Sequence, residues 1–342
     1  MKALVLNGAY DFSFEERSMP ERKDGEILIR MRAVSICGSD IHAIRGEQPL
    51  FTFPRVIGHE ISAVVADAGD SAKFREGDSV CVMPCIPCDS CMACKAGKTN
   101  CCSFLKLYGV HEDGGLQEYL SLPERFLLKN PFPDRQEEAA LIEPLTIGYH
   151  AVSRMRPGRG KRLLILGAGP IGTACAVCAE ALGMNAVLAD INPARREFVR
   201  KTFGFSVFNP LDETEKADVM GDIAQEGFDG VIDTTANKNS MEHAFEWIGH
   251  GGEIVFVGMF KGILQIDEAA FHMKEPSLHV TRNSVPEDYR SVMRLWEEGL
   301  VDPGLFITDR TAFENAGTEV LKWADGRQEV FKGIVEFRDC EI

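Results

Sequence analysis

The sequence predicts an α/β protein that combines a doubly wound parallel sheet with a β-rich domain. From residue 1 to about 145, short apolar segments are broken by Gly, Pro and Asp, and no long helical period occurs. From residue 162 onward, apolar strands alternate with helical patterns, which is typical of a parallel sheet with crossover helices. A chain of 342 residues is long for one core and suits two domains. We expect these domains at residues 1–147 and 148–284, with residues 285–342 packing back on the first.

The expected elements follow these patterns along the chain. The first part holds strands at 2–6, 26–36, 61–69 and 77–84, and a helix at 147–155. The second part begins with strand 162–166, helix 171–183, strand 185–191 and helix 193–204. Further strands are expected at 228–235, 251–260 and 277–283, followed by an amphipathic helix at 287–299 and a terminal strand at 332–337.

Charge and composition exclude some classes of partner. The formal net charge of −15 argues against nucleic acid, because phosphate binding requires a basic face. No stretch approaches the roughly 18 apolar residues that a membrane span requires. The N-terminal residues lack the pattern of a secretory signal, so a cytoplasmic location is expected. Neither observation argues against a small-molecule substrate, which is the partner that we expect.

A cluster of cysteines predicts a structural zinc site. Seven of the eleven cysteines lie between Cys81 and Cys102, and such crowding in a reduced compartment indicates metal binding. Four thiolates without an open position describe a structural zinc, and the compact spacing favours Cys88, Cys91, Cys94 and Cys102. Spacing alone leaves open whether Cys85 or Cys101 replaces one of these ligands.

A second, scattered group is a candidate catalytic zinc site. Cys37 in ICGSDIH is followed by His59 and Glu60 in VIGHE, and Glu143 lies among apolar residues in LIEPLTIG. A thiolate, an imidazole and a carboxylate can hold zinc and keep one position open for a substrate. A buried carboxylate at position 143 requires a cation or a proton.

A glycine motif predicts dinucleotide binding. The motif follows an apolar strand and opens a helix, as the tight turn and the pyrophosphate site require; it comprises Gly167, Gly169, Pro170, Ile171 and Gly172. Asp190 ends the next strand, where a carboxylate can bind both ribose hydroxyls and repel a 2′-phosphate. This favours NAD over NADP, although Arg195 and Arg196 follow closely and weaken the preference.

In this order, the motifs resemble those of the zinc-containing, medium-chain alcohol dehydrogenases over essentially the whole chain. The resemblance implies a GroES-like catalytic domain and a Rossmann NAD-binding domain. It implies that Cys37 and His59 hold the catalytic zinc, with Glu60 and Glu143 as further or alternating ligands. It also implies a homodimer or homotetramer formed by edge strands, with residues 251–260 and 261–266 at the contact.

The chain is more similar to sorbitol and threonine dehydrogenases than to ethanol-type enzymes, because it carries Cys-Gly-Ser-Asp and Glu143-Pro144. The segments GVHEDGGLQEY, EPLTIG and TRNS resemble those of bacterial sugar-acid dehydrogenases acting on L-gulonate, L-galactonate or L-idonate. The expected reaction is oxidation of a secondary alcohol of a sugar acid or polyol to a ketone. Ser39 is expected to accept the alcohol proton and pass it through the cofactor ribose to His42. Arg282 is a candidate for gripping a substrate carboxylate, with a surface ion pair as its alternative role.

Two alternatives remain open from the sequence. One is a threonine- or sorbitol-type dehydrogenase, which would share the zinc and NAD chemistry. The other is a non-catalytic sensor that binds a dinucleotide and uses the cysteine lobe. The set of Cys37, Ser39, His59, Glu60 and Glu143 argues against the sensor, because a sensor needs no apparatus for hydride transfer.

Overall fold

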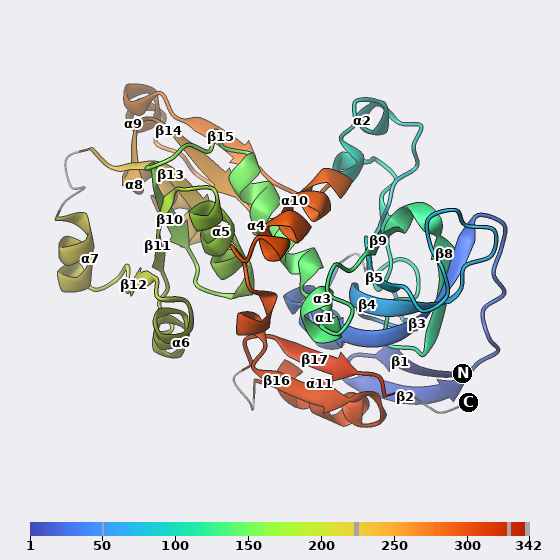
Figure 1. The fold of residues 1–342 in the computed structure, drawn as a ribbon. Coiled ribbons are helices and arrows are strands. Elements are labelled where there is room, and N and C mark those ends of the chain that lie inside the picture. Colours follow the sequence, from blue (N-terminus) through green and yellow to red (C-terminus); the bar gives the residue numbers. More distant parts are fainter. Residues whose placement is uncertain (50, 222–225, 327–329, 339–342) are drawn as a thin grey trace. The chain divides into compact units, whose positions relative to one another are not determined.

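The structure is a computed structural model that describes residues 1–49, 51–221, 226–326 and 330–338 (Figure 1). It divides into two compact units, Met1–Glu143 with Asp302–Ile342, and Pro144–Val301. The sequence analysis assigned residues 285–301 to the first domain, but the structure puts helix α10 (Pro286–Glu297) in the second unit. There, Asp288 Oδ2 lies 2.8 Å from His150 Nδ1 on α4 (Ile142–Ser153), and both side chains are largely buried.

The second unit is built on a six-stranded parallel sheet, which confirms the predicted doubly wound architecture. Its strand order is β12–β11–β10–β13–β14–β15. The order reverses at β10, so that right-handed crossovers put helices on both faces. The strands are β10 (Arg162–Leu166), β11 (Asn185–Ala189), β12 (Ser206–Phe208), β13 (Phe228–Asp233), β14 (Ile248–Phe256) and β15 (Ser277–Val280). The helices are α5 (Pro170–Ala181), α6 (Pro193–Phe203), α7 (Glu213–Met220), α8 (Lys238–Trp247) and α9 (Glu268–Lys274).

The edge of this sheet differs from the expected one. Residues 251–260 were expected at an outer contact, but β14 pairs with β13 on one side and β15 on the other. The apolar side chains of β14 are accordingly buried, including Ile254, Val255 and Phe256. The strand order ends at β15 on this side and at β12 on the other.

The first unit is built on a seven-stranded sheet in which the two ends of the chain meet. The main path is β16–β17–β3–β4–β5–β9, and β8 pairs with β3. Figure 1 shows β16, β17 and helix α11 (Ala316–Ala324), in red, beside the blue N-terminal strands. The strands of this sheet are β3 (Glu26–Ser35), β4 (Glu60–Asp67), β5 (Ser79–Val82), β8 (Tyr119–Pro123), β9 (Leu127–Lys129), β16 (Asp309–Ala312) and β17 (Gly333–Glu336).

Smaller elements complete the first unit. A hairpin of β1 (Lys2–Gly8) and β2 (Asp11–Glu16) covers the buried apolar side chains of the sheet. The short strands β6 (Cys85–Ile86) and β7 (Lys106–Leu107) pair at the base of the cysteine segment. The helices are α1 (Gly38–Ile44), α2 (Met92–Lys95) and α3 (Gln136–Ala140). Strand register sets Ser35 opposite both Ile334 and Glu60, so the end of β3, the start of β4 and the start of β17 meet.

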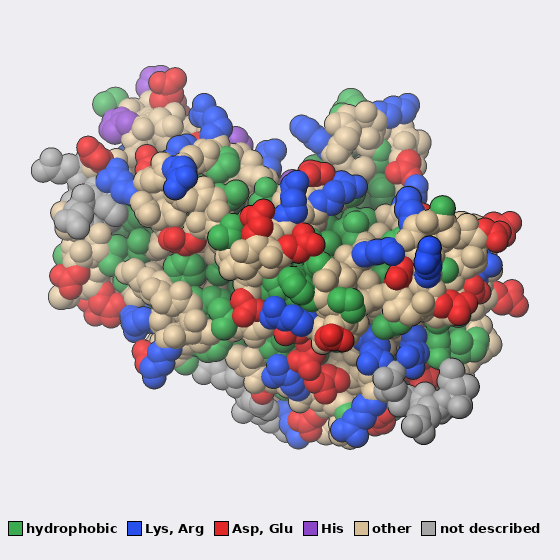
Figure 2. All heavy atoms as spheres, in the orientation of Figure 1, with side chains coloured by type: hydrophobic (Ala, Val, Ile, Leu, Met, Phe, Trp, Pro, Cys, Tyr) green, Lys and Arg blue, Asp and Glu red, His purple; other side chains and the backbone are tan. Residues whose placement is uncertain are grey.

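The surface drawn in Figure 2 carries both signs of charge. Acidic and basic side chains are interspersed over this face, and no large area is purely basic. Among the described residues, no helix has the length and apolarity that crossing a membrane requires.

Candidate active site

Cys37, His59 and Glu60 come together in the first unit although they are far apart in the sequence. Cys37 follows β3 and caps helix α1, whereas His59 and Glu60 stand at the start of β4. One ligand atom from each residue lies within 4.8 Å of the other two. His59 and Glu60 are buried, and Cys37 is half-buried. The structure thus gathers a thiol, an imidazole and a carboxylate at one point.

A second carboxylate, that of Asp40, contacts two members of this group. Asp40 is buried; its Oδ2 accepts a hydrogen bond from the Cys37 amide at 2.9 Å, and its Oδ1 accepts one from the Gly58 amide at 3.3 Å. The same Oδ1 lies 3.4 Å from His59 Nδ1. Burial lowers the pKa of His59, but the charges of Asp40 and Cys37 outweigh it and raise the pKa well above its usual value. The sequence analysis assigned Asp40 no role; its position three residues after the helix cap was the available signal.

Glu143 and Lys332 complete the charged surroundings. Glu143 is not among the three grouped residues. Burial raises the pKa of Glu143 to about 7; the charges of His59 and Lys332 act to lower it, and the charge of Glu60 acts to raise it. The Nζ of Lys332 lies 2.5 and 2.6 Å from the two carboxylate oxygens of Glu60. Burial lowers the pKa of Lys332, but the negative charges of Glu60 and Cys37 raise it by more. The pKa of Lys332 therefore lies above its usual value. Lys332 is 272 residues from Glu60 in the sequence, and no local pattern marks it as a buried lysine, so sequence analysis missed it.

The loop of residues 109–115 supports the segment that carries His59. The amides of Gly114, Gly115 and Leu116 donate hydrogen bonds of 2.7 to 3.0 Å to the carbonyls of Val56, Gly58 and Ile57. A Cβ added to Gly114 would lie 2.2 Å from the Gly58 carbonyl oxygen, so only glycine fits there. The motif GVHEDGGLQEY therefore has a structural role, whatever the substrate.

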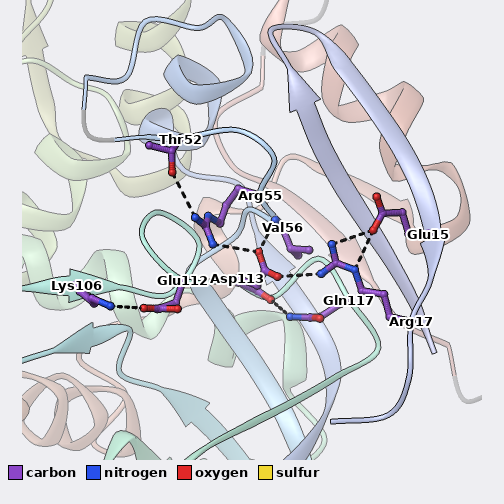
Figure 3. A network of polar contacts seen from close by, with 10 residues as sticks. Glu15, Arg17, Thr52, Arg55, Val56, Lys106, Glu112, Asp113 and Gln117 are labelled. Atoms are coloured by element: carbon purple, nitrogen blue, oxygen red, sulfur yellow. Dashed lines mark hydrogen bonds and ion pairs between the residues drawn. The ribbon is translucent and has the colours of Figure 1, made fainter.

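Asp113 anchors this loop to its neighbours (Figure 3). Its Oδ1 accepts a hydrogen bond from the Val56 amide at 3.0 Å, and its Oδ2 accepts one from Arg17 Nη1 at 2.9 Å. Arg55 Nη1 lies 3.6 Å from the same carboxylate. Three segments that are distant in sequence are thereby held near the start of β4.

The chemistry of the three grouped residues fits a catalytic zinc. Thiolate sulfur, imidazole nitrogen and carboxylate oxygen are the donors that such sites use, with one position left for substrate. Asp40 is the outer carboxylate that orients a ligating histidine in many zinc sites. His59 Nδ1 faces Asp40, which leaves the other ring nitrogen, Nε2, as the one that can ligate a metal ion.

The cysteine lobe forms a second metal-type group in the same unit. The four sulfur atoms of Cys88, Cys91, Cys94 and Cys102 all lie within 4.8 Å of one another. Backbone amides point at the sulfurs: Cys91 donates to Cys88 Sγ at 3.4 Å, and Phe104 donates to Cys102 Sγ at 3.3 Å. Hydrogen bonds from the amides of Cys94 and Ser103 lower the pKa of Cys91 to about 6. Four closely spaced thiols, two of them accepting backbone hydrogen bonds, fit a closed zinc site.

The two cysteines that left the ligand register open lie outside this group. Cys85 is in β6, paired with Leu107, and Cys101 is exposed at the end of a short 3₁₀ turn. Cys340 falls outside the described residues.

Ser39 and His42 lie on α1, three residues apart and therefore on one face of the helix. Ser39 is half-buried, whereas the His42 side chain is 58% exposed. His42 Nδ1 lies 2.9 Å from Glu47 Oε2. Ser39 thus lies two residues after Cys37, and His42 lies at the surface of the unit.

The predicted dinucleotide loop lies between β10 and α5 in the second unit. Gly167 has a φ of 99°, and Gly169 caps α5, with Pro170 as the first helical residue and Ile171 and Gly172 following. A Cβ on Gly172 would lie 1.8 Å from the Gly167 carbonyl oxygen, so the turn requires glycine.

Asp190, directly after β11, supports this loop. Its buried carboxylate accepts hydrogen bonds of 2.8 Å from the amides of Ala168 and Asn192. Arg195 Nη1 lies 3.8 Å from the same carboxylate. These contacts set an acidic group and a cation beside the glycine turn.

Arg282 lies in the second unit, directly after β15. Its side chain is exposed, and Asn283 beside it has a φ of 49°. Ser284 is buried and accepts a hydrogen bond from Thr146 Oγ1 at 2.8 Å, which fixes the segment TRNS against α4.

Comparison with known proteins supports the same chemistry. Residues 23–133 match the family described as alcohol dehydrogenase GroES-like domain, and residues 170–298 match zinc-binding dehydrogenase. The chain is 40% identical to the L-galactonate-5-dehydrogenase of Escherichia coli K12, over 98% of this chain and 99% of that protein. It is 32% identical to D-xylulose reductase A of Aspergillus oryzae, over 92% of this chain and 91% of that protein.

A solved structure shows the same fold. The structure titled short chain alcohol dehydrogenase (rspB) from E. coli CFT073, complexed with NADH, has a TM-score of 0.90 and 26% identity, and the match covers 98% of this chain and 99% of that one. The relatives named here are dehydrogenases and reductases, which excludes the interpretation as a non-catalytic sensor. With both domain families matched and full-length identity of 40%, the chain belongs to the zinc-binding alcohol dehydrogenase family and is an oxidoreductase.

Proposed function

We propose that this enzyme oxidises a secondary alcohol of a sugar acid, such as a hexonate, to the ketone with NAD⁺. The observation that carries the proposal is the buried group of Cys37, His59 and Glu60. The substrate class is supported by the 40% identity to L-galactonate-5-dehydrogenase over nearly the full length of both chains.

Two zinc ions are assigned to the first unit. Cys37 and His59 hold the catalytic ion, with Glu60 and Glu143 as further or alternating ligands, and Cys88, Cys91, Cys94 and Cys102 hold the structural ion. A catalytic zinc supplies Lewis acidity, which makes an alcohol more acidic at neutral pH. The lobe's four thiolates close a segment whose side chains are mostly exposed or half-buried and which therefore has little core of its own.

In the reaction, the alcohol carbon loses a hydride to NAD⁺ and the alcohol oxygen loses a proton, which yields the ketone, NADH and one proton. Ser39 accepts the proton first, because it stands two residues after Cys37 on the adjoining helix. His42, three residues further on the same face, delivers the proton to solvent, to which most of its side chain is exposed. Its hydrogen bond to Glu47 holds the ring in place.

NAD is assigned to the second unit. The turn of Gly167, Gly169 and Gly172 lets the pyrophosphate approach the backbone at the start of α5. Asp190 accepts the ribose hydroxyls and disfavours a 2′-phosphate, and Arg195 lies beside it. The structural relative crystallised with NADH is consistent with this assignment.

Arg282 is assigned to the substrate carboxylate. A guanidinium recognises a carboxylate through two parallel hydrogen bonds, which a neutral polyol cannot reproduce. The proposal is tested by following NADH formation with purified enzyme and a panel of hexonates, neutral polyols and L-threonine. We expect turnover of a hexonate and a rise of about tenfold or more in its KM for Arg282→Ala. Arg290→Ala is the matched control, because Arg290 is an exposed arginine of the same unit that pairs with Glu287.

A neutral polyol is the second candidate substrate, favoured by the 32% identity to D-xylulose reductase A. Turnover of polyols alone, unchanged by Arg282→Ala, would discard the sugar acid and keep the zinc dehydrogenase. Turnover of L-threonine alone would point to the amino-alcohol branch of the family.

Self-association through strand β15 is part of the proposal. This edge strand exposes Leu278 and Val280, and the preceding segment exposes Ile263 and Ile266. An unpaired apolar edge is a natural place for two copies to pair about a two-fold axis and continue the sheet. We expect a dimer or larger species by light scattering, and a monomer for Val280→Lys.

A reducing compartment such as the cytoplasm suits the protein. The ten cysteines within the described residues are all free thiols, and five of them, Cys37 and the four of the lobe, are needed unoxidised as zinc ligands.

A further inference from the structure

Thr234 is a hydroxyl residue beside the glycine turn to which the proposed function gives no role. It directly follows β13, and because Asp233 pairs with Leu166 in the parallel sheet, Thr234 lies beside Gly167. The amide and the hydroxyl of Thr234 both donate to the Leu166 carbonyl, at 2.9 and 3.0 Å. The same hydroxyl lies 3.4 Å from the Gly167 carbonyl oxygen. The hydroxyl thus contacts the backbone where strand β10 passes into the turn.

The turn admits this hydroxyl because it is made of glycines. A Cβ added to Gly167 would lie 2.6 Å from Thr234 Oγ1, and one added to Gly172 would lie 3.1 Å from the same atom. Gly167 follows the end of β10, and Gly172 lies in the first turn of α5. The hydroxyl of Thr234 therefore lies close to both ends of the predicted dinucleotide turn.

The neighbouring strand β11 holds the opposite side of the turn. The Gly167 amide donates to the Ala189 carbonyl at 2.7 Å, and the Ala168 amide donates to the Asp190 carboxylate at 2.8 Å. Strand β10 lies between β11 and β13 in the sheet. The contacts from β11 therefore fix amides of the turn, whereas those from Thr234 fix carbonyls at its start.

A buried carboxylate fixes the strand end that carries Thr234. Asp233 is fully buried, and its Oδ1 accepts hydrogen bonds of 2.8 Å from the amide and the hydroxyl of Thr235. Its Oδ2 accepts one of 2.5 Å from the hydroxyl of Ser240 on α8. Thr234 lies between two residues that are held in this way, so its backbone has little freedom to follow a displaced turn.

We propose that Thr234 is a positioning residue that sets the glycine turn for the pyrophosphate of the dinucleotide. The inference rests on the proposed function, in which NAD binds at this turn. The backbone of such a turn must approach the pyrophosphate closely, and the amides at the start of the helix are the donors. A displacement of the turn therefore weakens binding, and the hydroxyl of Thr234 prevents that displacement.

The test compares the affinity of Thr234→Val and Thr234→Ser for NADH in the full-length enzyme. Valine puts a methyl group in the place of the hydroxyl, which lies 3.0 Å from the Leu166 carbonyl oxygen. A carbon atom approaches a carbonyl oxygen only to about 3.3 Å, so the methyl group must displace the turn. From NADH fluorescence we expect a Kd about tenfold higher for Thr234→Val. Thr234→Ser keeps the hydroxyl and should bind NADH like the parent enzyme.

Thr173→Val is the matched control. Thr173 follows Gly172 on α5 and is fully buried, and its hydroxyl has no hydrogen-bond partner among the described residues. This substitution removes no hydrogen bond of the turn, so the Kd for NADH should stay at the parent value. In the steady state, Thr234→Val should raise the KM for NAD⁺ and leave kcat at saturating NAD⁺ unchanged. A general loss of folded enzyme would lower kcat instead.

Thr234→Ala keeps the test available if Thr234→Val folds poorly, because alanine removes the hydroxyl without putting a methyl group in its place. We expect Thr234→Ala to bind NADH more weakly than Thr234→Ser does. Equal affinity of the alanine and serine variants overturns the proposal. A parent-like Kd in Thr234→Val overturns it as well, and so does an equal loss of affinity in Thr173→Val.

Failure of the proposed function has a different signature. If the parent enzyme does not bind NADH, or binds NADPH more tightly, the assignment of NAD itself is wrong. If the parent enzyme binds NADH and Thr234→Val leaves the Kd unchanged, only the role of Thr234 is refuted.

Discussion

The carboxylate of Asp40 lies 3.4 Å from the imidazole of His59 and also accepts the amide hydrogens of Cys37 and Gly58. One buried side chain therefore fixes two candidate zinc ligands from different segments. An asparagine has a single acceptor oxygen, so it cannot serve the same set of donors without setting its amide group against one of them.

We therefore predict that Asp40→Asn weakens zinc binding at the catalytic site by about 10–100-fold. Competition with a chromophoric chelator measures this change. Asp24→Asn, at an exposed turn of the same unit, is the control and should bind zinc like the parent enzyme. Undiminished zinc affinity in Asp40→Asn would show that Asp40 does not orient the ligands.

Gly114 gives a second prediction, because its lack of a side chain allows the loop to approach Gly58. A Cβ would lie 2.2 Å from the Gly58 carbonyl oxygen, so Gly114→Ala must displace the backbone directly before His59. We expect a loss of about 1–3 kcal/mol in the free energy of unfolding and a lower kcat. Urea denaturation and the NADH assay check this; Gly8→Ala, which meets no atom within 4 Å, should leave both unchanged.

Sequence patterns correctly predicted the features whose residues lie close together in the chain. The glycine turn, the helix that it opens and Asp190 follow one another within one βαβ unit, so the sequence order already implies their proximity. The cysteines of the lobe lie within fifteen residues of one another, and their spacing sufficed to predict the group that the structure brings together.

Long-range relationships were beyond the sequence pattern. The pairing of Lys332 with Glu60 spans 272 residues and depends on β17 joining β3, which no periodicity reveals. Strand β14 lies inside the sheet because β15 pairs with its outer side. The residues of an apolar strand do not by themselves show whether the strand is at the edge or in the interior of a sheet. Helix α10 was expected with the first domain but lies in the second unit, where Asp288 contacts His150, 138 residues earlier in the chain.

The cysteine lobe allows a prediction with a closely matched control. Cys94 belongs to the four-sulfur group, whereas Cys101 is exposed and outside it. We expect Cys94→Ser to hold about one zinc per chain instead of two and to unfold at a lower temperature, since zinc binding contributes to folding. Cys101→Ser should keep both ions by elemental analysis. Loss of zinc in Cys101→Ser, with none in Cys94→Ser, would reverse the ligand assignment.

Glu336 on β17 predicts a dependence of stability on pH. A hydrogen bond with Glu137, together with partial burial and the negative charge of Glu137, raises the pKa of Glu336 to about 7 from its usual value of 4.5. Arg310 Nε lies 2.6 Å from Glu137 Oε2 and 3.9 Å from Glu336 Oε1, and its charge opposes this shift without cancelling it. The folded protein therefore holds a proton between two carboxyl groups that the unfolded chain releases more readily.

Because the folded pKa is the higher one, the stabilisation is complete below about pH 4.5 and is lost as the pH rises through about 7. We predict that the parent enzyme loses more unfolding free energy between pH 5 and pH 8 than Glu336→Gln does, since the variant has no proton to lose there. Urea denaturation at both pH values measures the difference. Glu314→Gln, an exposed glutamate of the same unit, controls for the change in net charge and should follow the parent curve. A Glu336→Gln curve as steep as that of the parent would mean that the two carboxyl groups do not share a proton in solution.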